Sequence, residues 1–305
     1  MNQTVAASQQ AIAQGSQSFA AAARLMPAGI RDDTVMLYAW CRYADDVIDG
    51  QEMGSRPELA DNPAARLEAL RADTLAALHE DRPMSPPFEA LRAVARRHDF
   101  PDAWPLDLIQ GFAMDVEARQ YRTLADTLDY SYHVAGVVGV MMARVMGVRD
   151  QAVLDRACDL GLAFQLTNIA RDVMDDARIG RVYLPADWLD EAGARIEGEI
   201  PSELLYAVIL RLLDAAEPYY ASAMAGLRAL SPRCAWSIAS AARIYRAIGT
   251  RIRQGGPQAY RARIRTSGAA KAGLALRGGW DVARSRLPGA KPGRDGLWTR
   301  AHGRD

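Results

Sequence analysis

The sequence lacks the features that mark disulfide-rich, zinc-binding and membrane-spanning proteins. Its three cysteines, Cys41, Cys158 and Cys234, stand singly in apolar helical patterns, so we expect a reduced chain without a disulfide framework. The four histidines are scattered without ligand spacing, which argues against a zinc site. No positive region precedes the mild apolar run at the N-terminus, and the longest apolar run, 134–143, is too short to span a bilayer. These absences favour a cytoplasmic protein.

An excess of charge of one sign is also absent, because 37 Lys and Arg residues balance 37 Asp and Glu residues. This balance creates no general attraction to nucleic acid, and we expect no nucleic-acid partner. Lysine is rare, since it occurs only at Lys271 and Lys291, and nearly all the positive charge is therefore arginine. Arginine suits bidentate binding of phosphate oxygens better than lysine does.

Strand patterns and fixed-period repeats are missing as well. Several stretches instead show the helical period of 3.6 residues. At 305 residues and 50% hydrophobic, the chain can bury one large core. We therefore predict an all-α fold with a flexible N-terminus (1–15), a single helical domain (16–265) and a partly disordered tail rich in Arg, Gly and Pro (266–305).

The most informative stretch that is present is LGLAFQLTNIARDVMDDARIGRVYLP, from Leu160 to Pro185. Its helical part carries a polar stripe in which Asn168, Asp172 and Asp176 share one face with Gln165. Carboxylates four residues apart repel each other unless a cation lies between them. The stripe suits a hard divalent ion such as Mg²⁺, although a solvated acidic face is the commoner origin of a lone Asp-x-x-x-Asp pair.

A second helix carries a comparable stripe. In DTVMLYAWCRYADDVID a tyrosine, an arginine and two aspartates fall on one helical face. If this face lies opposite the first stripe, the two form an acidic mouth that requires metal ions. Such ions would bridge to a polyanion, most simply a diphosphate, whose remaining oxygens suit arginine. The residues of this second stripe are Tyr38, Arg42, Asp45 and Asp49.

A third stretch, 128–146, is predicted to be one amphipathic helix with Gly136 and Gly139 in its middle. A glycine inside a helix costs roughly 1 kcal/mol relative to alanine. Close approach of a neighbouring helix explains this pair better than space left for a ligand.

These segments together resemble the squalene/phytoene synthase family, the head-to-head branch of the trans-isoprenyl diphosphate synthases. DDVID at 45–49 is similar to the family's first Asp-rich motif, and YHVAGVVGVMMARVMG from Tyr132 is similar to a second segment. The stretch 160–185 resembles the family's long signature, which is highly specific. The likeness covers about residues 15 to 265 and is greatest to the bacterial, phytoene-forming members. It implies a bundle of the isoprenoid synthase type around a central cavity.

The resemblance also implies roles for single residues. The implied metal ligands are Asp45, Asp49, Asp172, Asp176 and Asn168. The residues implied to contact diphosphate or to order its surroundings are Tyr38, Arg42, Gln165, Arg171, Arg181, Tyr183, Ser16, Ser18 and Tyr245, of which the last three lie outside any long motif. The implied walls of the prenyl pocket are Phe19, Tyr132, Val137, Leu160 and Phe164. The alternative is a surface ion pair for each arginine and a core residue with one satisfied hydroxyl for each tyrosine.

The implied activity is that of a prenyltransferase of carotenoid biosynthesis. It joins two molecules of geranylgeranyl diphosphate head to head, through prephytoene diphosphate, to phytoene, and releases diphosphate. Mg²⁺ is the expected cofactor, with Mn²⁺ as a substitute, and no NADPH is expected. Because substrate and product are apolar, we also expect transient contact with the inner face of the cell membrane and handover to a phytoene desaturase.

Two alternatives remain open at this point. One is a squalene or dehydrosqualene synthase that acts on farnesyl diphosphate. The other is a catalytically silent helical protein that only holds prenyl lipids, although intact aspartates on both helices argue against it.

Overall fold

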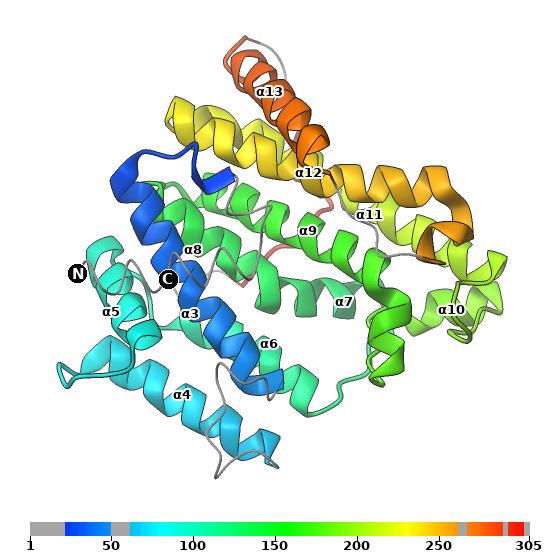
Figure 1. The fold of residues 1–305 in the computed structure, drawn as a ribbon, viewed down its shortest axis with the longest axis horizontal. Helices are drawn as coiled ribbons and strands as arrows, with labels where there is room; N and C mark the ends of the chain where they lie inside the picture. The colour runs from blue at the N-terminus through cyan, green and yellow to red at the C-terminus, as the bar shows by residue number, and fades with distance from the viewer. Residues whose placement is uncertain (1–21, 50–61, 262–266, 289–291, 302–305) are drawn as a thin grey trace.

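The structure, a computed structural model, describes residues 22–49, 62–261, 267–288 and 292–301. These residues form helices and connecting turns, and no strand occurs among them, so the all-α, single-domain prediction is confirmed. Figure 1 shows the arrangement of the helices. In chain order they are α3 (Ala28–Asp49), α4 (Pro63–His79), α5 (Pro86–His98), α6 (Ala103–Val116), α7 (Leu124–Ser131), η2 (Tyr132–Gly136), α8 (Val137–Val145), α9 (Gln151–Arg178), α10 (Ala186–Ala192), α11 (Glu203–Gly226), η3 (Leu227–Ala229), α12 (Pro232–Gly255), η4 (Gly256–Arg261) and α13 (Gly268–Ser285).

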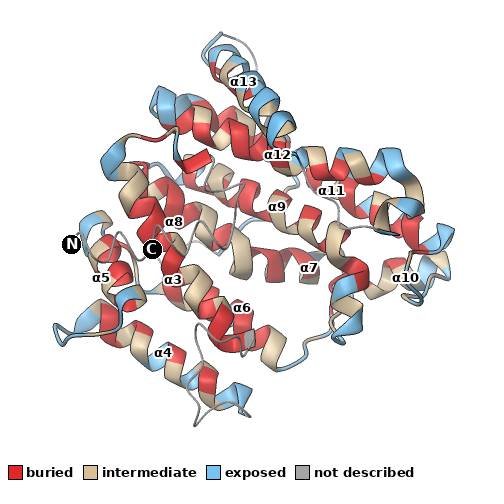
Figure 2. Cartoon of the chain, viewed as in Figure 1, coloured by how far each residue is buried: buried red, intermediate tan, exposed pale blue. Residues whose placement is uncertain are grey.

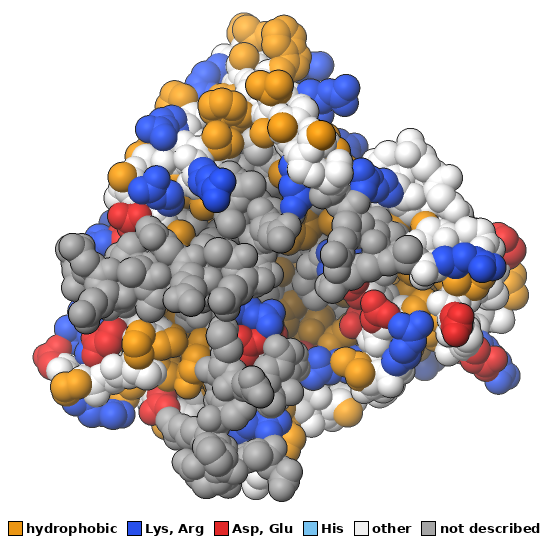
Figure 3. All heavy atoms as spheres, in the orientation of Figure 1, with side chains coloured by type: hydrophobic (Ala, Val, Ile, Leu, Met, Phe, Trp, Pro, Cys, Tyr) orange, Lys and Arg blue, Asp and Glu red, His pale blue; other side chains and the backbone are white. Residues whose placement is uncertain are grey.

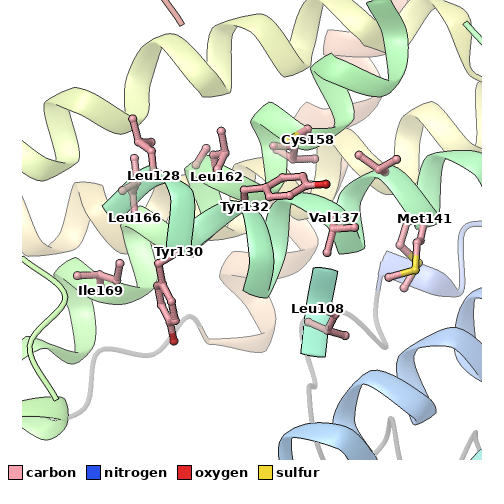
Figure 4. Packing of buried hydrophobic residues seen from close by; sticks show 14 of the residues in the cluster. Leu108, Leu128, Tyr130, Tyr132, Val137, Met141, Cys158, Leu162, Leu166 and Ile169 are labelled. Carbon is pink, nitrogen blue, oxygen red and sulfur yellow. The ribbon is translucent and has the colours of Figure 1, made fainter. Parts of the chain in front are cut away.

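Helix α9 runs through the middle of the bundle, with α7, α8, α11 and α12 packed around it (Figure 1). The side chain of Asp150 caps its first turn, and 28 residues without a proline keep it continuous. Leu162 and Leu166 are fully buried, and they belong to the same hydrophobic cluster as Leu128 of α7 (Figure 4). This helix is buried along much of its length (Figure 2), which fixes the position of the polar stripe it carries.

Glycines allow the chain from η2 to α8 to cross α9 at very short range. A Cβ added at Gly161 of α9 would collide with the backbone carbonyl of Ala135, and one at Gly139 would collide with that of Ala157. Only glycine fits these positions without separation of the helices. The close-packing interpretation of the glycines at this crossing is confirmed.

The helix predicted over 128–146 is not continuous. The structure interrupts it between α7 and α8 with one π-helical turn, η2, from Tyr132 to Gly136. Such turns insert one extra residue and shift the following side chains around the helix axis, and they occur frequently at functional sites. The interruption lies where the chain crosses α9 most closely, at Ala135 and Gly136.

Part of the region for which the sequence favours partial disorder packs against α9. Arg294 forms two hydrogen bonds with the carboxylate of Asp159, each 2.8 Å long. Arg300 donates from Nε to Oδ1 of Asp155 at 3.1 Å. Asp159 is 0% exposed and also accepts a hydrogen bond from Ser222 at 2.5 Å. Two arginines near the end of the chain thus neutralise two carboxylates in the first half of α9.

None of the helices in the described ranges is both long enough and apolar enough to cross a membrane.

Candidate active site

The polar stripe of α9 carries negative charge that its surroundings do not fully balance. Burial, followed by the nearby charge of Asp172, raises the pKa of Asp176 to about 7, and Arg181 only partly opposes this rise. One turn before Asp172, the Oδ1 atom of Asn168 is buried and has no hydrogen-bond partner among the described residues. Two crowded carboxylates and an unused amide oxygen fit a hard divalent cation.

The described residues do not by themselves complete a metal centre. No three carboxylate, histidine or cysteine side chains lie together among them. The amide of Asn168 is of another type, and the side chain of Asp49 lies outside the described residues. The assignment of metal ligands therefore stays a prediction for Asp45, Asp49, Asn168, Asp172 and Asp176.

On α3, Arg42 lies between two carboxylates with different surroundings. It pairs with Asp45 at 3.2 Å and with Asp46 at 2.5 Å. The Asp46 side chain is 2% exposed, whereas that of Asp45 is 45% exposed. Burial lowers the pKa of Arg42, but both carboxylates outweigh it and the net shift is upward. Asp46 thus acts as a fixed buried counter-ion, and Asp45 keeps contact with solvent.

Tyr245 of α12 connects the stripe of α9 with the stripe of α3. Its ring stacks on that of Phe164, with centroids 4.1 Å apart and planes 17° apart. Burial raises the pKa of Tyr245, and the charges of Arg171 and Asp172 lower and raise it respectively. Burial also raises the pKa of Tyr38 to about 12, and Tyr245 adds to that shift. Tyr245 is therefore within electrostatic reach of residues on both stripes.

Two arginines from the long signature lie beside its carboxylates. Arg171 makes a bidentate pair with Asp172, in which Nε donates to Oδ1 at 2.7 Å. The charge of Arg181 lowers the pKa values of both Asp176 and Tyr183, so it lies near the last carboxylate of the stripe. Gln165 is half-buried on α9, two turns before Asp172. The signature thus brings cations and carboxylates together at the C-terminal end of α9.

A tyrosine cluster surrounds Asp115 at the end of α6. Tyr183 donates a hydrogen bond to Asp115 at 2.9 Å, and Tyr130 donates to its other oxygen at 3.0 Å. The two rings stack with centroids 4.6 Å apart, and Tyr121 packs against both. Burial, followed by Asp115, raises the pKa of Tyr183. Tyr183 therefore stays protonated at neutral pH and acts as a hydrogen-bond donor.

Sequence patterns do not mark Asp115, Tyr121 or Tyr130. Asp115 stands near the end of the apolar segment GFAMDV, and no tyrosine at helical spacing accompanies it in the sequence. Stacking of the tyrosine rings joins α7 to the segment after α9. The only local signal of this in the sequence is the pair of tyrosines at the two ends of YRTLADTLDY, residues 121–130.

The residues assigned to the prenyl pocket are mostly buried. Val137 is 0% and Leu160 is 7% exposed. Tyr132 donates a hydrogen bond to Asp107 at 2.6 Å, and its ring lies 5.3 Å from that of Trp298. Their role as pocket walls stays a prediction. Three further assigned residues lie outside the described residues: Ser16, Ser18 and Phe19.

Comparison with known proteins places these features in a family context. A family model for squalene/phytoene synthase matches residues 12–270. A 15-cis-phytoene synthase from a Paracoccus species is 76% identical over 302 residues, which cover 99% of each chain. A phytoene synthase from Pseudescherichia vulneris is 50% identical and covers 95% of this chain and 96% of its own.

Solved structures share the fold. A dehydrosqualene synthase in complex with a ligand superposes with a TM-score of 0.82 at 28% identity, covering 93% of this chain and 98% of the other. A squalene synthase from Alicyclobacillus acidocaldarius gives a TM-score of 0.72 at 23% identity, covering 84% of this chain and 94% of the other. The second likeness is one of fold alone.

Proposed function

The chain belongs to the squalene/phytoene synthase family, and we propose that it joins two molecules of geranylgeranyl diphosphate head to head to form phytoene. The near full-length likeness to a 15-cis-phytoene synthase supports this proposal most strongly. The acidic stripe of α9 and the stripe of α3 that carries Tyr38 and Arg42 are proposed to supply the groups that the reaction requires, and the electrostatic influence of Tyr245 on Tyr38 supports this.

Mg²⁺ is the proposed cofactor, with Mn²⁺ as a substitute. The unused Oδ1 of Asn168 and the raised pKa of Asp176 support a cation at this face. When bound, the ions supply Lewis-acid stabilisation of the leaving diphosphate. The residues proposed to hold them are Asp45, Asp49, Asn168, Asp172 and Asp176.

The chain's own donors are proposed to bind and orient the diphosphates. Arginine gives paired hydrogen bonds to phosphate oxygens, and tyrosines with raised pKa values stay protonated and donate. A leaving diphosphate gains negative charge as its C–O bond breaks, so donors fixed in advance stabilise that step more than the ground state. The proposed donors are Tyr38, Arg42, Gln165, Arg171, Arg181, Tyr183, Tyr245, Ser16 and Ser18.

The reaction has two halves. In the first, one allylic C–O bond breaks, the double bond of the second molecule attacks the allylic carbon, and loss of a proton closes the cyclopropane of prephytoene diphosphate. In the second, the remaining C–O bond breaks, and rearrangement with loss of a proton gives phytoene. Each half releases one diphosphate and one proton, so no hydride donor such as NADPH is consumed. The buried side chains of Val137 and Leu160 and the partly buried ring of Phe164 are proposed to keep water from the cations.

Formation of dehydrosqualene from farnesyl diphosphate is the second candidate. The superposition on a dehydrosqualene synthase favours it, because both activities use one fold and the same first chemical step. The higher identity to the phytoene synthases makes it the weaker candidate.

The apolar product implies two further partners. We propose peripheral contact with the inner face of the cell membrane, where a geranylgeranyl chain resides, and handover of phytoene to a phytoene desaturase.

Removal of metal tests the proposed site. With Mg²⁺, the purified protein is expected to release diphosphate from geranylgeranyl diphosphate, and excess EDTA should slow the release by about a hundredfold or more. Added Mg²⁺ or Mn²⁺ should restore it. Ion chromatography of quenched samples measures the diphosphate. Release that EDTA leaves unchanged would contradict the metal assignment, and release from farnesyl diphosphate alone would contradict the substrate.

A further inference from the structure

Helix α13 carries the two most exposed large hydrophobic side chains of the described chain. Leu276 is 73% exposed and Trp280 is 71% exposed, and Leu287, just beyond the last turn, is 63% exposed. Leu276 and Trp280, four residues apart, lie on one face of the helix, and Leu287 follows its C-cap, Arg286. The outer face of α13 is also the exposed side of the helix in Figure 2. We call these three residues the α13 stripe.

The packing of α13 on α12 fixes the stripe on the outside. At Gly278 the two helices approach so closely that a Cβ would press against the α12 backbone. Trp236 of α12 donates a hydrogen bond from Nε1 to a backbone carbonyl of α13 at 2.7 Å. Arg243 of α12 forms a bidentate pair with Asp281 of α13. Because these contacts all use the opposite face, the helix cannot turn its apolar stripe inward.

The charges around the stripe are positive. Arg277 and Arg284 are exposed beside it, and neither pairs with a carboxylate among the described residues. Asp281 is the one acidic residue of α13, and Arg243 neutralises it on the inner face. At the top of Figure 3, orange hydrophobic side chains at this end of the molecule are flanked by blue basic ones. The surface thus combines exposed apolar side chains with unbalanced arginine charge.

We propose that the α13 stripe, with Arg277 and Arg284, is a docking surface for an anionic lipid bilayer. Arginines without carboxylate partners match lipid phosphates, and an amphipathic helix of this kind lies in the headgroup region with its apolar side chains directed into the membrane. Trp280 suits that depth, because an indole ring prefers the boundary between hydrocarbon and water.

The assignment of a bilayer rather than a protein partner rests on the proposed function. A geranylgeranyl chain and a hydrocarbon product both partition into lipid. The helix that holds α13 also reaches the candidate site, since Tyr245 follows Arg243 by two residues on α12. Docking through α13 would therefore bring the lipid surface within one helix of the site.

Vesicle binding by the purified full-length protein tests this surface. In sedimentation with vesicles of phosphatidylcholine containing about 30% phosphatidylglycerol, we expect a large bound fraction. With pure phosphatidylcholine, the partition coefficient should fall by roughly fivefold for each arginine that contacts anionic lipid. Binding requires no turnover, so this assay does not depend on the proposed reaction.

Three variants separate the contributions. Leu276→Ser combined with Trp280→Ser should lower the partition coefficient by about tenfold or more on both vesicle types. Arg277→Gln combined with Arg284→Gln should remove the preference for anionic vesicles. Leu204→Ser is the matched control, because this side chain is 53% exposed on α11, and it should bind as the unchanged protein does. Circular dichroism checks that each variant is folded.

The outcomes are decisive in both directions. Loss of binding in the two α13 variants but not in the control supports the proposal. A protein that stays in the supernatant with both vesicle types overturns it, as does binding that no variant weakens. A dimer in light scattering that only the Leu276→Ser, Trp280→Ser variant abolishes, without vesicle binding, assigns the face to a second copy instead. Diphosphate release from detergent-dispersed substrate should persist in every variant, so its loss would count against the proposed function and not against the docking surface.

Discussion

Substitution of Asp172 by asparagine is expected to lower kcat/KM for phytoene formation by about a thousandfold or more. The carboxylate stands at the centre of the α9 stripe, one turn after Asn168 and one turn before Asp176. Its loss removes one negative charge from the proposed cation site and leaves Arg171 without its bidentate partner. The fold should persist, because burial and then the charge of Asp172 raise the pKa of Asp176, and the substitution removes the second of these.

Asp175 provides a matched control for this substitution. It lies on the same helix three residues later, but its side chain is 63% exposed and pairs with Arg178 at 2.5 Å. Asp175→Asn should leave kcat/KM within about twofold, since an exposed pair contributes little. Steady-state assays and thermal melts of both variants give the comparison. An Asp172→Asn enzyme within tenfold of the unchanged protein, or equal losses in both variants, would show that the stripe does not carry the reaction.

Substitution of Arg294 by alanine is expected to lower the free energy of unfolding by about 3–5 kcal/mol. The change leaves the carboxylate of Asp159, which is 0% exposed, without its cation. Only the hydrogen bond from Ser222 would remain, and one hydroxyl donor does not replace a guanidinium. Urea unfolding monitored by circular dichroism measures the loss.

Two controls identify the buried charge as the cause. Arg253 forms an exposed pair with Asp214 at 2.6 Å, and Arg253→Ala should cost only about 0–1 kcal/mol. The double variant Asp159→Asn, Arg294→Met should recover part of the stability, because it removes both charges together. If Arg294→Ala costs no more than Arg253→Ala, the C-terminal segment does not stabilise α9 in the way described.

Local spacing predicts the features of the site that depend on a single helix. Asn168, Asp172 and Asp176 share a face because the helical period is 3.6, and the same rule places Tyr38 and Arg42 together on α3. The glycines that the sequence marks as close packing do lie where η2 and α8 cross α9. Each of these predictions uses residues that are only a few turns apart.

Contacts between residues that are far apart in the sequence follow no helical spacing, so the sequence does not predict them. Asp45 and Asp46 are adjacent acids in the sequence, and only the packing of α3 shows that Asp46 is the buried one. Arg294 and Asp159 are 135 residues apart, so neither marks the other. Asp115 of α6 gains its tyrosine partners Tyr130 and Tyr183 from other segments. The interruption by η2 lies where the chain packs against α9, and helix propensity does not describe such a contact.

The most direct measurement is an analysis of the hydrocarbons that the purified protein makes. Geranylgeranyl diphosphate and farnesyl diphosphate are supplied separately, with Mg²⁺ and without NADPH, and the extracts are separated by chromatography with mass detection. We expect phytoene from geranylgeranyl diphosphate, with two diphosphates released for each phytoene, and little or no hydrocarbon from farnesyl diphosphate. Dehydrosqualene as the main product, or no hydrocarbon from either substrate, would contradict the proposed function.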